Sequence, residues 1–327
     1  MHSFVIKYKN ILYGVLGICL FQGIISDYLG FRQVNYLCDI LLVLLLVVML
    51  CRKQVKLNKT TNNIEYISIL AFAIVALIGW GLNTVRLPSA LWGLRNYGRF
   101  FLFFLLGRSL WNGEDVETME NFFMKIFPIH MILIAFQYVV EGLNQDFLSG
   151  LFGKTAGGNG GLMIYLSVIL CIVICQFEYK KISTKKFVCY LLLIFVNAAL
   201  SELKFLFVLA SLLVVWYLAM SKRKGRGMIL ALFFVIALYV GMQIFYYVFP
   251  FWANYLSFDN IMTMISDQEV YANQMDVGRT AVFSKLTPVI TKWAGQHAVW
   301  FGIGLGNGDY SDAIPMLNSA FYTVYGI

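Results

Sequence analysis

Charged residues are scarce in this chain. Only 13% of its 327 residues are Asp, Glu, Lys or Arg, whereas 60% are hydrophobic. An ordinary soluble domain is about a quarter charged, and a soluble fold of this length exposes more surface than so few charges can cover. The low charge therefore excludes a soluble globular protein and predicts an all-α polytopic integral membrane protein.

Metal-ligating residues are also scarce. The three histidines, His2, His130 and His297, lie far apart in sequence. The six cysteines lie in or beside apolar runs, and none forms a CxxC or Cys/His ligand pattern. We therefore expect no structural disulfide, no metal site and no cofactor. Walker, nucleophile-elbow and protease patterns are missing as well, which excludes the enzyme classes that depend on them.

Long apolar runs are abundant, and about 20 apolar residues cross a bilayer core of ~30 Å. Nine runs have the composition of a span: 11–26, 36–51, 66–83, 91–110, 121–141, 160–177, 187–200, 203–220 and 228–249. The first run resembles a signal peptide but lacks a small-residue cleavage site, so we expect an uncleaved span. A tenth span is expected to begin near Ser319 and is cut off at Ile327.

Positive charge alternates between the loops of this topology. With a cytoplasmic N-terminus, 16 of the 25 Lys and Arg residues fall on the inner side. They are Lys7, Lys9, Arg52, Lys53, Lys56, Lys59, Arg108, Lys125, Lys180, Lys181, Lys185, Lys186, Lys222, Arg223, Lys224 and Arg226. This bias predicts the orientation, and it explains the net charge of +8 without a nucleic-acid partner.

Three regions follow from the spans. Residues 1–249 are expected to form the transmembrane bundle, 250–318 a long extracytoplasmic loop, and 319–327 the start of the truncated tenth helix. Within the loop, residues 280–294 carry apolar residues at roughly helical spacing, which predicts an amphipathic helix on the outer membrane surface.

Arg95 and Arg99 lie inside the fourth predicted span, four residues apart and therefore on one helix face. An arginine near the middle of a membrane costs about 2.5–3.5 kcal/mol on insertion scales. One interpretation pairs them with Asp39, Glu202 or Glu141, or lets Arg95 reach the interface. The other has both guanidinium groups face an outward cavity and bind an anion such as a lipid pyrophosphate.

Other polar candidates lie near the predicted outer ends of the spans. Glu202 and Lys204 either neutralise each other or face the same cavity as the arginines. Gly302, Gly304, Gly306 and Gly308 alternate in FGIGLGNG, which is typical either of a flexible loop or of a phosphate-wrapping loop. Asn159, in GKTAGGNGG, is either a turn residue or a carbohydrate contact.

Five segments form one pattern along the chain: NYLCDILLVLLL, LRNYGRFFLFFLLG, LSELKFLFVLAS, DVGRTAVFSKL…FGIGLGNG and LNSAFYTVYGI. This pattern resembles the O-antigen and capsular polysaccharide repeat-unit polymerases (Wzy-type), which form a superfamily with the O-antigen ligases. The Gly-Arg…Gly-x-Gly-x-Gly loop is its most specific part. Leu317-Asn318 stands where ligases commonly have His-Asn, which favours a polymerase. Leu203-Lys204 stands where the family usually has Ser-Arg, so a lysine replaces that arginine.

The resemblance implies a membrane glycosyltransferase of the bacterial cytoplasmic membrane. It would pass a growing glycan from undecaprenyl pyrophosphate to a hydroxyl of the next lipid-linked unit, with inversion, at the outer face. The implied catalytic residues are Arg95, Arg99, Arg279, Lys204 and Glu202, with Asp276 and His297 as further candidates for the base. The implied substrate contacts are Asn159, Gly304, Gly306 and Asn318. Partners would be the lipid-linked oligosaccharide, membrane lipid, a flippase and a chain-length regulator.

Three other functions remain open on the sequence. A lipid-linked oligosaccharide flippase would often show paired halves, and we find no internal repeat. A ligase would move finished glycan to another acceptor. A scaffold without chemistry would leave Arg95 and Arg99 no role beyond pairing.

Overall fold

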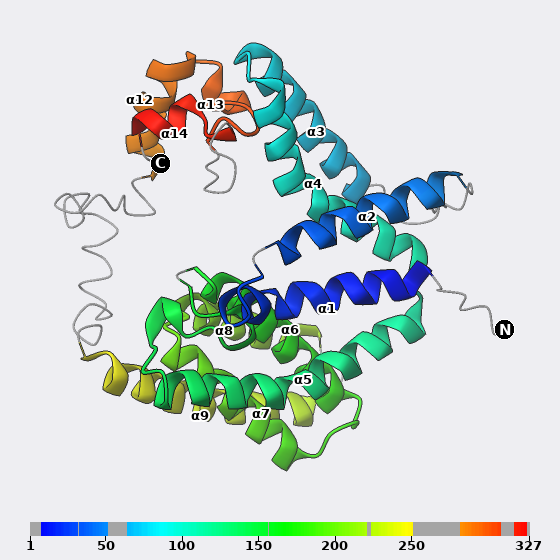
Figure 1. Ribbon diagram of the computed structural model, residues 1–327. Helices are drawn as coiled ribbons and strands as arrows, with labels where there is room; N and C mark the ends of the chain where they lie inside the picture. Colours follow the sequence, from blue (N-terminus) through cyan, green and yellow to red (C-terminus); the bar gives the residue numbers. More distant parts are fainter. Residues whose placement is uncertain are drawn as a thin grey trace. The chain divides into compact units, whose positions relative to one another are not determined.

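The computed structural model describes residues 8–31, 33–51, 64–155, 157–220, 224–250, 282–308 and 317–325. Within these ranges the regular structure is helical and no strand occurs (Figure 1), which confirms the all-α prediction for this part of the chain. The α-helices are α1 Tyr8–Asp27, α2 Val34–Cys51, α3 Ile64–Leu82, α4 Leu87–Leu110, α5 Gly113–Val139, α6 Asn159–Glu178, α7 Thr184–Leu200, α8 Lys204–Met220, α9 Lys224–Val248, α12 Val282–Ala294, α13 Ala298–Phe301 and α14 Ala320–Tyr325. Two short 3-10 helices, η1 Gln145–Phe147 and η2 Gly150–Phe152, lie between α5 and α6.

Each of the nine predicted spans falls on one of the helices α1 to α9. Among the described residues, four helical segments are long and apolar enough to cross a membrane: Tyr8–Asp27, Gly113–Val139, Asn159–Glu178 and Ala231–Val248. Three shorter helical segments are also apolar: Tyr36–Cys51, Tyr66–Leu82 and Lys204–Leu218. These helices fit a membrane protein. The count of nine spans stays a prediction.

The start of α5 differs from the sequence prediction, which placed it at residue 121. The helix begins at Gly113 because Asn112 and Asp115 form a capping box. The Asn112 side chain accepts a hydrogen bond from the Asp115 backbone N–H (3.0 Å), and the Asp115 carboxylate accepts one from the Asn112 N–H (3.1 Å). Such reciprocal bonds satisfy the free donors of a helix start. Lys125 therefore lies well inside the helix instead of near its beginning.

The chain divides into two compact units. The first comprises Met1–Leu12, Asp39–Leu110 and Phe258–Ile327, and the second Tyr13–Cys38 and Trp111–Ser257. The first unit therefore holds α3, α4, α12, α13 and α14, and the second holds the helices from α5 to α9.

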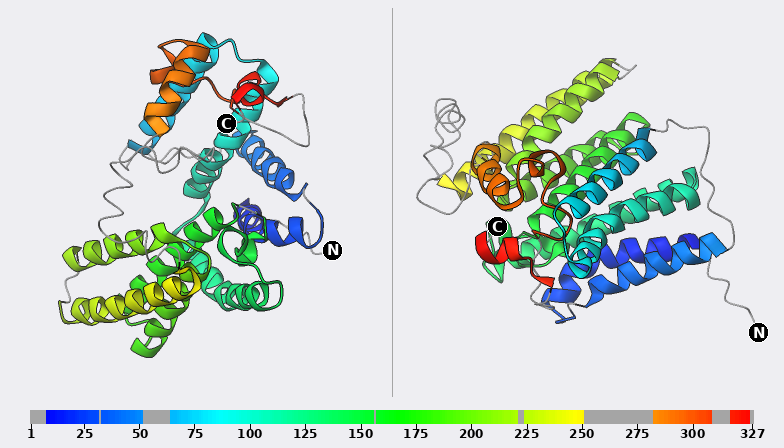
Figure 2. Two further views of the ribbon diagram at one scale, coloured as in Figure 1. Left: turned by 90° about the vertical axis from the view of Figure 1, so that its left-hand side faces the viewer. Right: turned by 90° about the horizontal axis from the view of Figure 1, so that it is seen from above.

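The core of the second unit is built by α6 to α9. These helices lie side by side in both views of Figure 2, and α7 packs most extensively against α9. Phe195 of α7 is fully buried and stacks on Phe207 of α8 (5.5 Å between ring centres) while it meets Phe234 of α9 edge-on. The turn between α7 and α8 falls at Ser201-Glu202, as the sequence predicted.

In the first unit, α12 and α13 follow one another and α13 packs against α3 (Figure 1). The predicted amphipathic helix over 280–294 corresponds to α12, whose described part places Leu286, Val289, Ile290 and Trp293 at helical spacing. The Trp293 ring meets Phe321 of α14 edge-on at 5.7 Å. The start of the predicted tenth span is helical in α14, where the Ser319 hydroxyl accepts a hydrogen bond from the Tyr322 N–H (3.0 Å).

Candidate functional site

The two arginines of α4 differ in their surroundings. Arg95 forms an ion pair with Asp39 of α2, with Nε and Nη2 2.7 and 2.6 Å from the same oxygen, Oδ2. Its guanidinium also lies 4.5 Å above the ring of Trp92. Both partners of the pair are largely shielded, with 22% and 16% of their side-chain surface exposed. Of the partners weighed for Arg95 on the sequence, Asp39 is the one that the structure provides.

Arg99 lies one turn farther along α4. Its guanidinium is 4.9 Å from the ring centre of Phe100. Its Nε atom is buried, and among the described residues nothing accepts a hydrogen bond from it. A buried guanidinium donor without an acceptor is costly, and an anionic ligand would satisfy it. Arg99 is therefore the stronger of the two anion-binding candidates.

The glycine-rich segment packs directly on α3 and α4, and we name residues 301–308 the glycine loop. Gly304 and Gly306 have φ angles of +89° and +81°, which disfavour any residue with a Cβ. A Cβ on Gly306 would lie 1.8 Å from the Ser89 carbonyl oxygen of α4. Conversely, a Cβ on Gly93 of α4 would lie 2.3 Å from the Gly306 nitrogen. The glycines thus allow backbone-to-backbone contact between the loop and the helix that carries both arginines.

A polar clamp holds the start of the glycine loop to the end of α3. The Asn83 side-chain amide donates to the carbonyl oxygens of Gly79 (2.7 Å) and Gly302 (3.1 Å). These two bonds identify its nitrogen, so the Asn83 oxygen accepts from His297 Nε2 at 3.2 Å. In its neutral form His297 therefore keeps Nδ1 unprotonated, as a general base requires. The structure thus brings this base candidate to the same helical hairpin, α3–α4, as the arginines.

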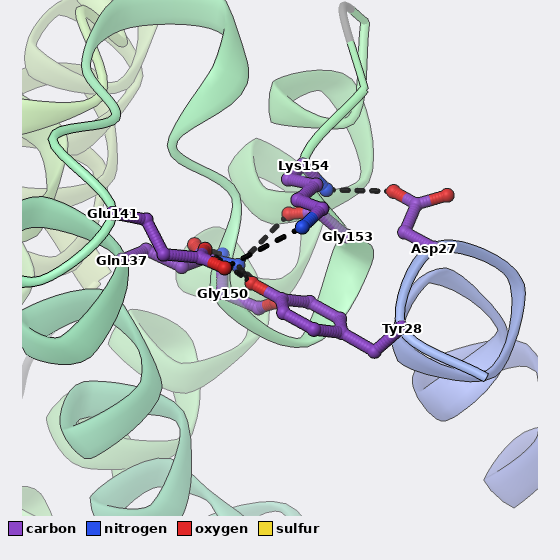
Figure 3. A network of polar contacts seen from close by, with 7 residues as sticks. All are labelled: Asp27, Tyr28, Gln137, Glu141, Gly150, Gly153 and Lys154. Atoms are coloured by element: carbon purple, nitrogen blue, oxygen red, sulfur yellow. Dashed lines mark hydrogen bonds and ion pairs between the residues drawn. The ribbon is translucent and has the colours of Figure 1, made fainter.

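In the second unit, Gln137 of α5 organises the connection between α5 and α6 (Figure 3). Its side chain is fully buried. Its oxygen accepts a hydrogen bond from the Gly150 N–H at 2.7 Å, and its nitrogen lies 3.2 and 3.1 Å from the carbonyl oxygens of Gly150 and Gly153. A single amide side chain therefore satisfies the backbone of the η2 turn, which no sequence argument had singled out.

Charged groups surround this turn in Figure 3. The Tyr28 hydroxyl donates to Glu141 (2.6 Å), Lys154 pairs with the same carboxylate (3.4 Å), and the Lys154 backbone N–H donates to Asp27 (2.7 Å). Burial, and then the bond to Glu141, raise the pKa of Tyr28 to about 12. Glu141 is therefore engaged within its own unit. Asn159 begins α6 and donates to Asp146, so its amide already has an acceptor.

A second polar chain runs through the helices of this unit. His130, Asn197 and Ser201 are fully buried. His130 Nδ1 accepts from the Leu151 N–H (3.4 Å), and the Asn197 side-chain amide lies 2.8 Å from Nε2. The Asn197 side-chain oxygen accepts a hydrogen bond from the Ser201 hydroxyl (3.3 Å). The sequence analysis did not identify these three residues; the signal that could have found them is the spacing of polar residues inside apolar runs.

Glu202 and Lys204 lie at the turn between α7 and α8 and pair with each other at 2.9 Å. Of the two sequence interpretations, mutual neutralisation is the one that this geometry provides. Glu202 has a φ angle of +57°, an uncommon conformation for a residue with a side chain. The turn is thereby closed tightly enough to pair neighbouring side chains.

The candidate residues divide between the two units. Arg95, Arg99, Gly304, Gly306 and Asn318 belong to the first, whereas Asn159, Glu202 and Lys204 belong to the second. Asn318 directly precedes Ser319, which caps α14. Arg279 and Asp276 lie outside the described residues. In the part that is described, no cluster of three or more His, Cys, Asp and Glu residues could hold a metal ion.

No protein-family model, curated protein or solved structure matches this chain. The polymerase resemblance therefore depends on the sequence pattern alone.

Proposed function

We propose that this protein is a membrane glycosyltransferase that polymerises lipid-pyrophosphate-linked oligosaccharide repeat units into a surface polysaccharide. The proposed topology has nine complete spans, a cytoplasmic N-terminus and a long outer loop after the ninth span. The charge distribution supports this orientation, because 16 of the 25 cationic side chains fall on the inner side. The reaction would then occur at the outer face of the bacterial cytoplasmic membrane.

The observation that carries the proposal is the environment of Arg99. Its Nε is buried without an acceptor among the described residues, and it lies on the helix against which the glycine loop packs. A guanidinium with an unsatisfied Nε donor inside a predicted membrane span is a functional-site candidate by default. A pyrophosphate group is an anion of suitable charge, because guanidinium donors match phosphate oxygens in pairs.

The proposed reaction is a displacement at the anomeric carbon of the donor glycan. A hydroxyl oxygen of the acceptor unit forms a bond to that carbon, and the bond between the carbon and the pyrophosphate oxygen breaks. The pyrophosphate leaves with the electron pair, and the hydroxyl proton passes to a base. Arg99 and Arg279 would stabilise the charge that develops on the leaving group. His297 is the base candidate with the clearest geometry, since the bond to Asn83 keeps its Nδ1 available.

The test is the glycan made by Arg99→Ala in a strain that lacks its own polymerase. We expect surface glycan of a single repeat unit, because synthesis and export precede polymerisation. Removal of one charge-stabilising donor typically lowers a rate by about 10²–10³. Arg99→Lys should restore activity only in part, because a lysine lacks the paired donors.

Arg108→Ala is the matched control. Arg108 lies on the same helix, with its guanidinium 5.2 Å from the ring centre of Tyr66. The Arg108→Ala variant should produce surface glycan of wild-type chain length at an equal protein level. Wild-type lengths from a well-accumulated Arg99→Ala would refute the proposal. Loss of all surface glycan, with lipid-linked units retained inside, would favour the flippase instead.

A further inference from the structure

An apolar groove of about 400 Å³ runs between α3 and α4. We name it the α3–α4 groove. Small residues create it, namely Ala73 and Ala76 on α3 and Ala90 and Gly98 on α4. The one polar atom among its lining side chains, Trp80 Nε1, donates to the Val85 carbonyl oxygen (2.9 Å). The groove therefore offers no hydrogen-bonding group to a ligand, and only a hydrocarbon fits its chemistry.

The length of the groove matches one leaflet of a bilayer. On α4 it extends from Leu87 to Phe101, and on α3 from Ile69 to Trp80. At 1.5 Å per residue these stretches measure about 21 and about 16 Å. Half of a bilayer core is about 15 Å, the depth that one lipid tail reaches from its own leaflet. The match favours a single acyl tail over a polyprenyl chain, which is much longer than one leaflet is deep.

The end of the groove near Leu87 has the features of a membrane interface. Trp80 lines this end, and tryptophan is enriched where lipid headgroups begin. The preceding residue in the chain, Arg86, is exposed. A cationic residue directly before Leu87, the first lining residue on α4, suits a phosphate group joined to a hydrocarbon tail.

The groove also touches the glycine loop. Leu305 contributes its lining on the loop side, and a Cβ on Gly93 of α4 would lie 2.7 Å from the Leu305 carbonyl carbon. The neighbouring residue, Gly306, makes the closest approach of the loop to α4. A tail in the groove would therefore contact α3, α4 and the loop together, and would add buried apolar area only when the loop is docked.

We propose that the α3–α4 groove binds one acyl tail of an anionic phospholipid, with the phosphate at Arg86. The bound lipid stabilises the docked glycine loop. This inference is independent of the polymerase proposal, because lipid binding and loop protection are measured without any glycan. A polyprenyl lipid and a second copy of this chain are the competing occupants.

The test is native mass spectrometry of the purified full chain with palmitoyl-oleoyl phosphatidylglycerol or phosphatidylcholine added. We expect one bound phosphatidylglycerol, retained about fivefold better than phosphatidylcholine, since a surface cation contributes about that factor. Arg86→Gln should abolish this preference. Gly98→Leu should abolish the bound lipid, because a Cβ there meets only Leu94 in ordinary contact (3.6 Å) and the longer side chain fills the groove.

Gly81→Leu is the matched control, because a Cβ on Gly81 of α3 meets nothing within 4 Å. It should keep the lipid. If Gly98→Leu fails to fold, Ala76→Leu repeats the test, with Ala71→Leu as its control outside the groove lining. Hydrogen exchange of residues 301–308 should slow with phosphatidylglycerol in the wild type but not in the groove-filled variant.

Four results would overturn the inference. The first is lipid that stays bound to the groove-filled variants. The second is hydrogen exchange of residues 301–308 that does not change when lipid is added. The third is displacement of phosphatidylglycerol by added polyprenyl phosphate, which would identify a different ligand. The fourth is a dimer that dissociates in Gly98→Leu, which would identify the groove as a contact between copies.

Discussion

Substitution of Gly306 by alanine separates a docked glycine loop from a merely flexible one. Alanine at a φ angle of +81° is strained by about 1–2 kcal/mol. Its Cβ would also lie 1.8 Å from the Ser89 carbonyl oxygen, where the neighbour is helix backbone and cannot rotate away. Overpacking of this kind costs about 1–3 kcal/mol. Together we expect Gly306→Ala to destabilise docking of the loop by about 2–5 kcal/mol.

Two other glycines separate the backbone strain from the steric clash, and a third serves as the control. Gly302 has a φ angle of +69°, but a Cβ added there would meet nothing within 4 Å, so Gly302→Ala measures strain alone. Gly93 has an ordinary helical conformation, but its Cβ would meet the loop backbone at 2.3 Å, so Gly93→Ala measures the clash alone. Alanine should meanwhile favour α4 itself by about 1 kcal/mol. Gly308→Ala is the control, because its nearest contact would be Ile303 at 3.8 Å.

The assay is hydrogen exchange of residues 301–308 in the purified protein. Exchange should rise most in Gly306→Ala and clearly in Gly93→Ala, less in Gly302→Ala, and stay unchanged in Gly308→Ala. Exchange within α7 and α9 should not change in any of the four. If Gly306→Ala and Gly308→Ala exchange alike, the loop is not held by its backbone contact with α4 and the reasoning fails.

Three further predictions concern other polar contacts. Asp39→Ala should lower the unfolding free energy by about 1–3 kcal/mol, because it leaves a largely shielded guanidinium without its ion-pair partner. Chemical denaturation should show that the double variant Asp39→Ala, Arg95→Ala recovers part of this loss. Additive effects of the two substitutions would contradict the ion pair. Gln137→Ala should cost about 2–4 kcal/mol in unfolding free energy, since several backbone contacts of a buried amide are lost, whereas the exposed Gln243→Ala should change it by less than about 0.5. Tyr28 should ionise near pH 12 by ultraviolet difference titration against Tyr28→Phe. Because its folded pKa exceeds the ordinary value of 10, its stabilising contribution is complete below pH 10 and is lost between pH 10 and 12. Ionisation near pH 10 would contradict the bond between Tyr28 and Glu141.

The helices could be predicted because their signal is local. An apolar run is recognised from its own residues, so each predicted segment falls on a helix, whereas the number of membrane spans stays a prediction. The start of α5 was wrong by eight residues for the same reason. Its capping box, Asn112 with Asp115, lies in a polar stretch, and a search for apolar runs passes over it. Helix ends are set by such polar bonds, so hydropathy alone could not find them.

The sequence could predict only those residues of the candidate site that lie on one helix or that stand out as charged residues in an apolar run. Arg95 and Arg99 share α4, and Asp39 could be named as a partner because acids are rare in apolar runs. The clamp between Asn83 and His297 joins residues 214 positions apart, and neither residue has a local signal for the other. The same holds for His130 and Asn197, which are 67 positions apart. Contacts of this kind follow from helix packing, which hydropathy and spacing do not specify.

The hydrogen-bond partners of the polar groups inside the predicted spans show which of these groups is still free to bind a ligand. Arg95 bonds to Asp39, Gln137 to the η2 turn, and His130 to Asn197, so each has a structural role that explains why it is tolerated inside a predicted span. Arg99 Nε has no such partner among the described residues. An anion at Arg95 would have to compete with a carboxylate already 2.6 Å away, whereas an anion at Arg99 Nε would displace none. If α4 binds a pyrophosphate, the first contact is therefore Arg99, and Arg95 acts by holding α4 against α2.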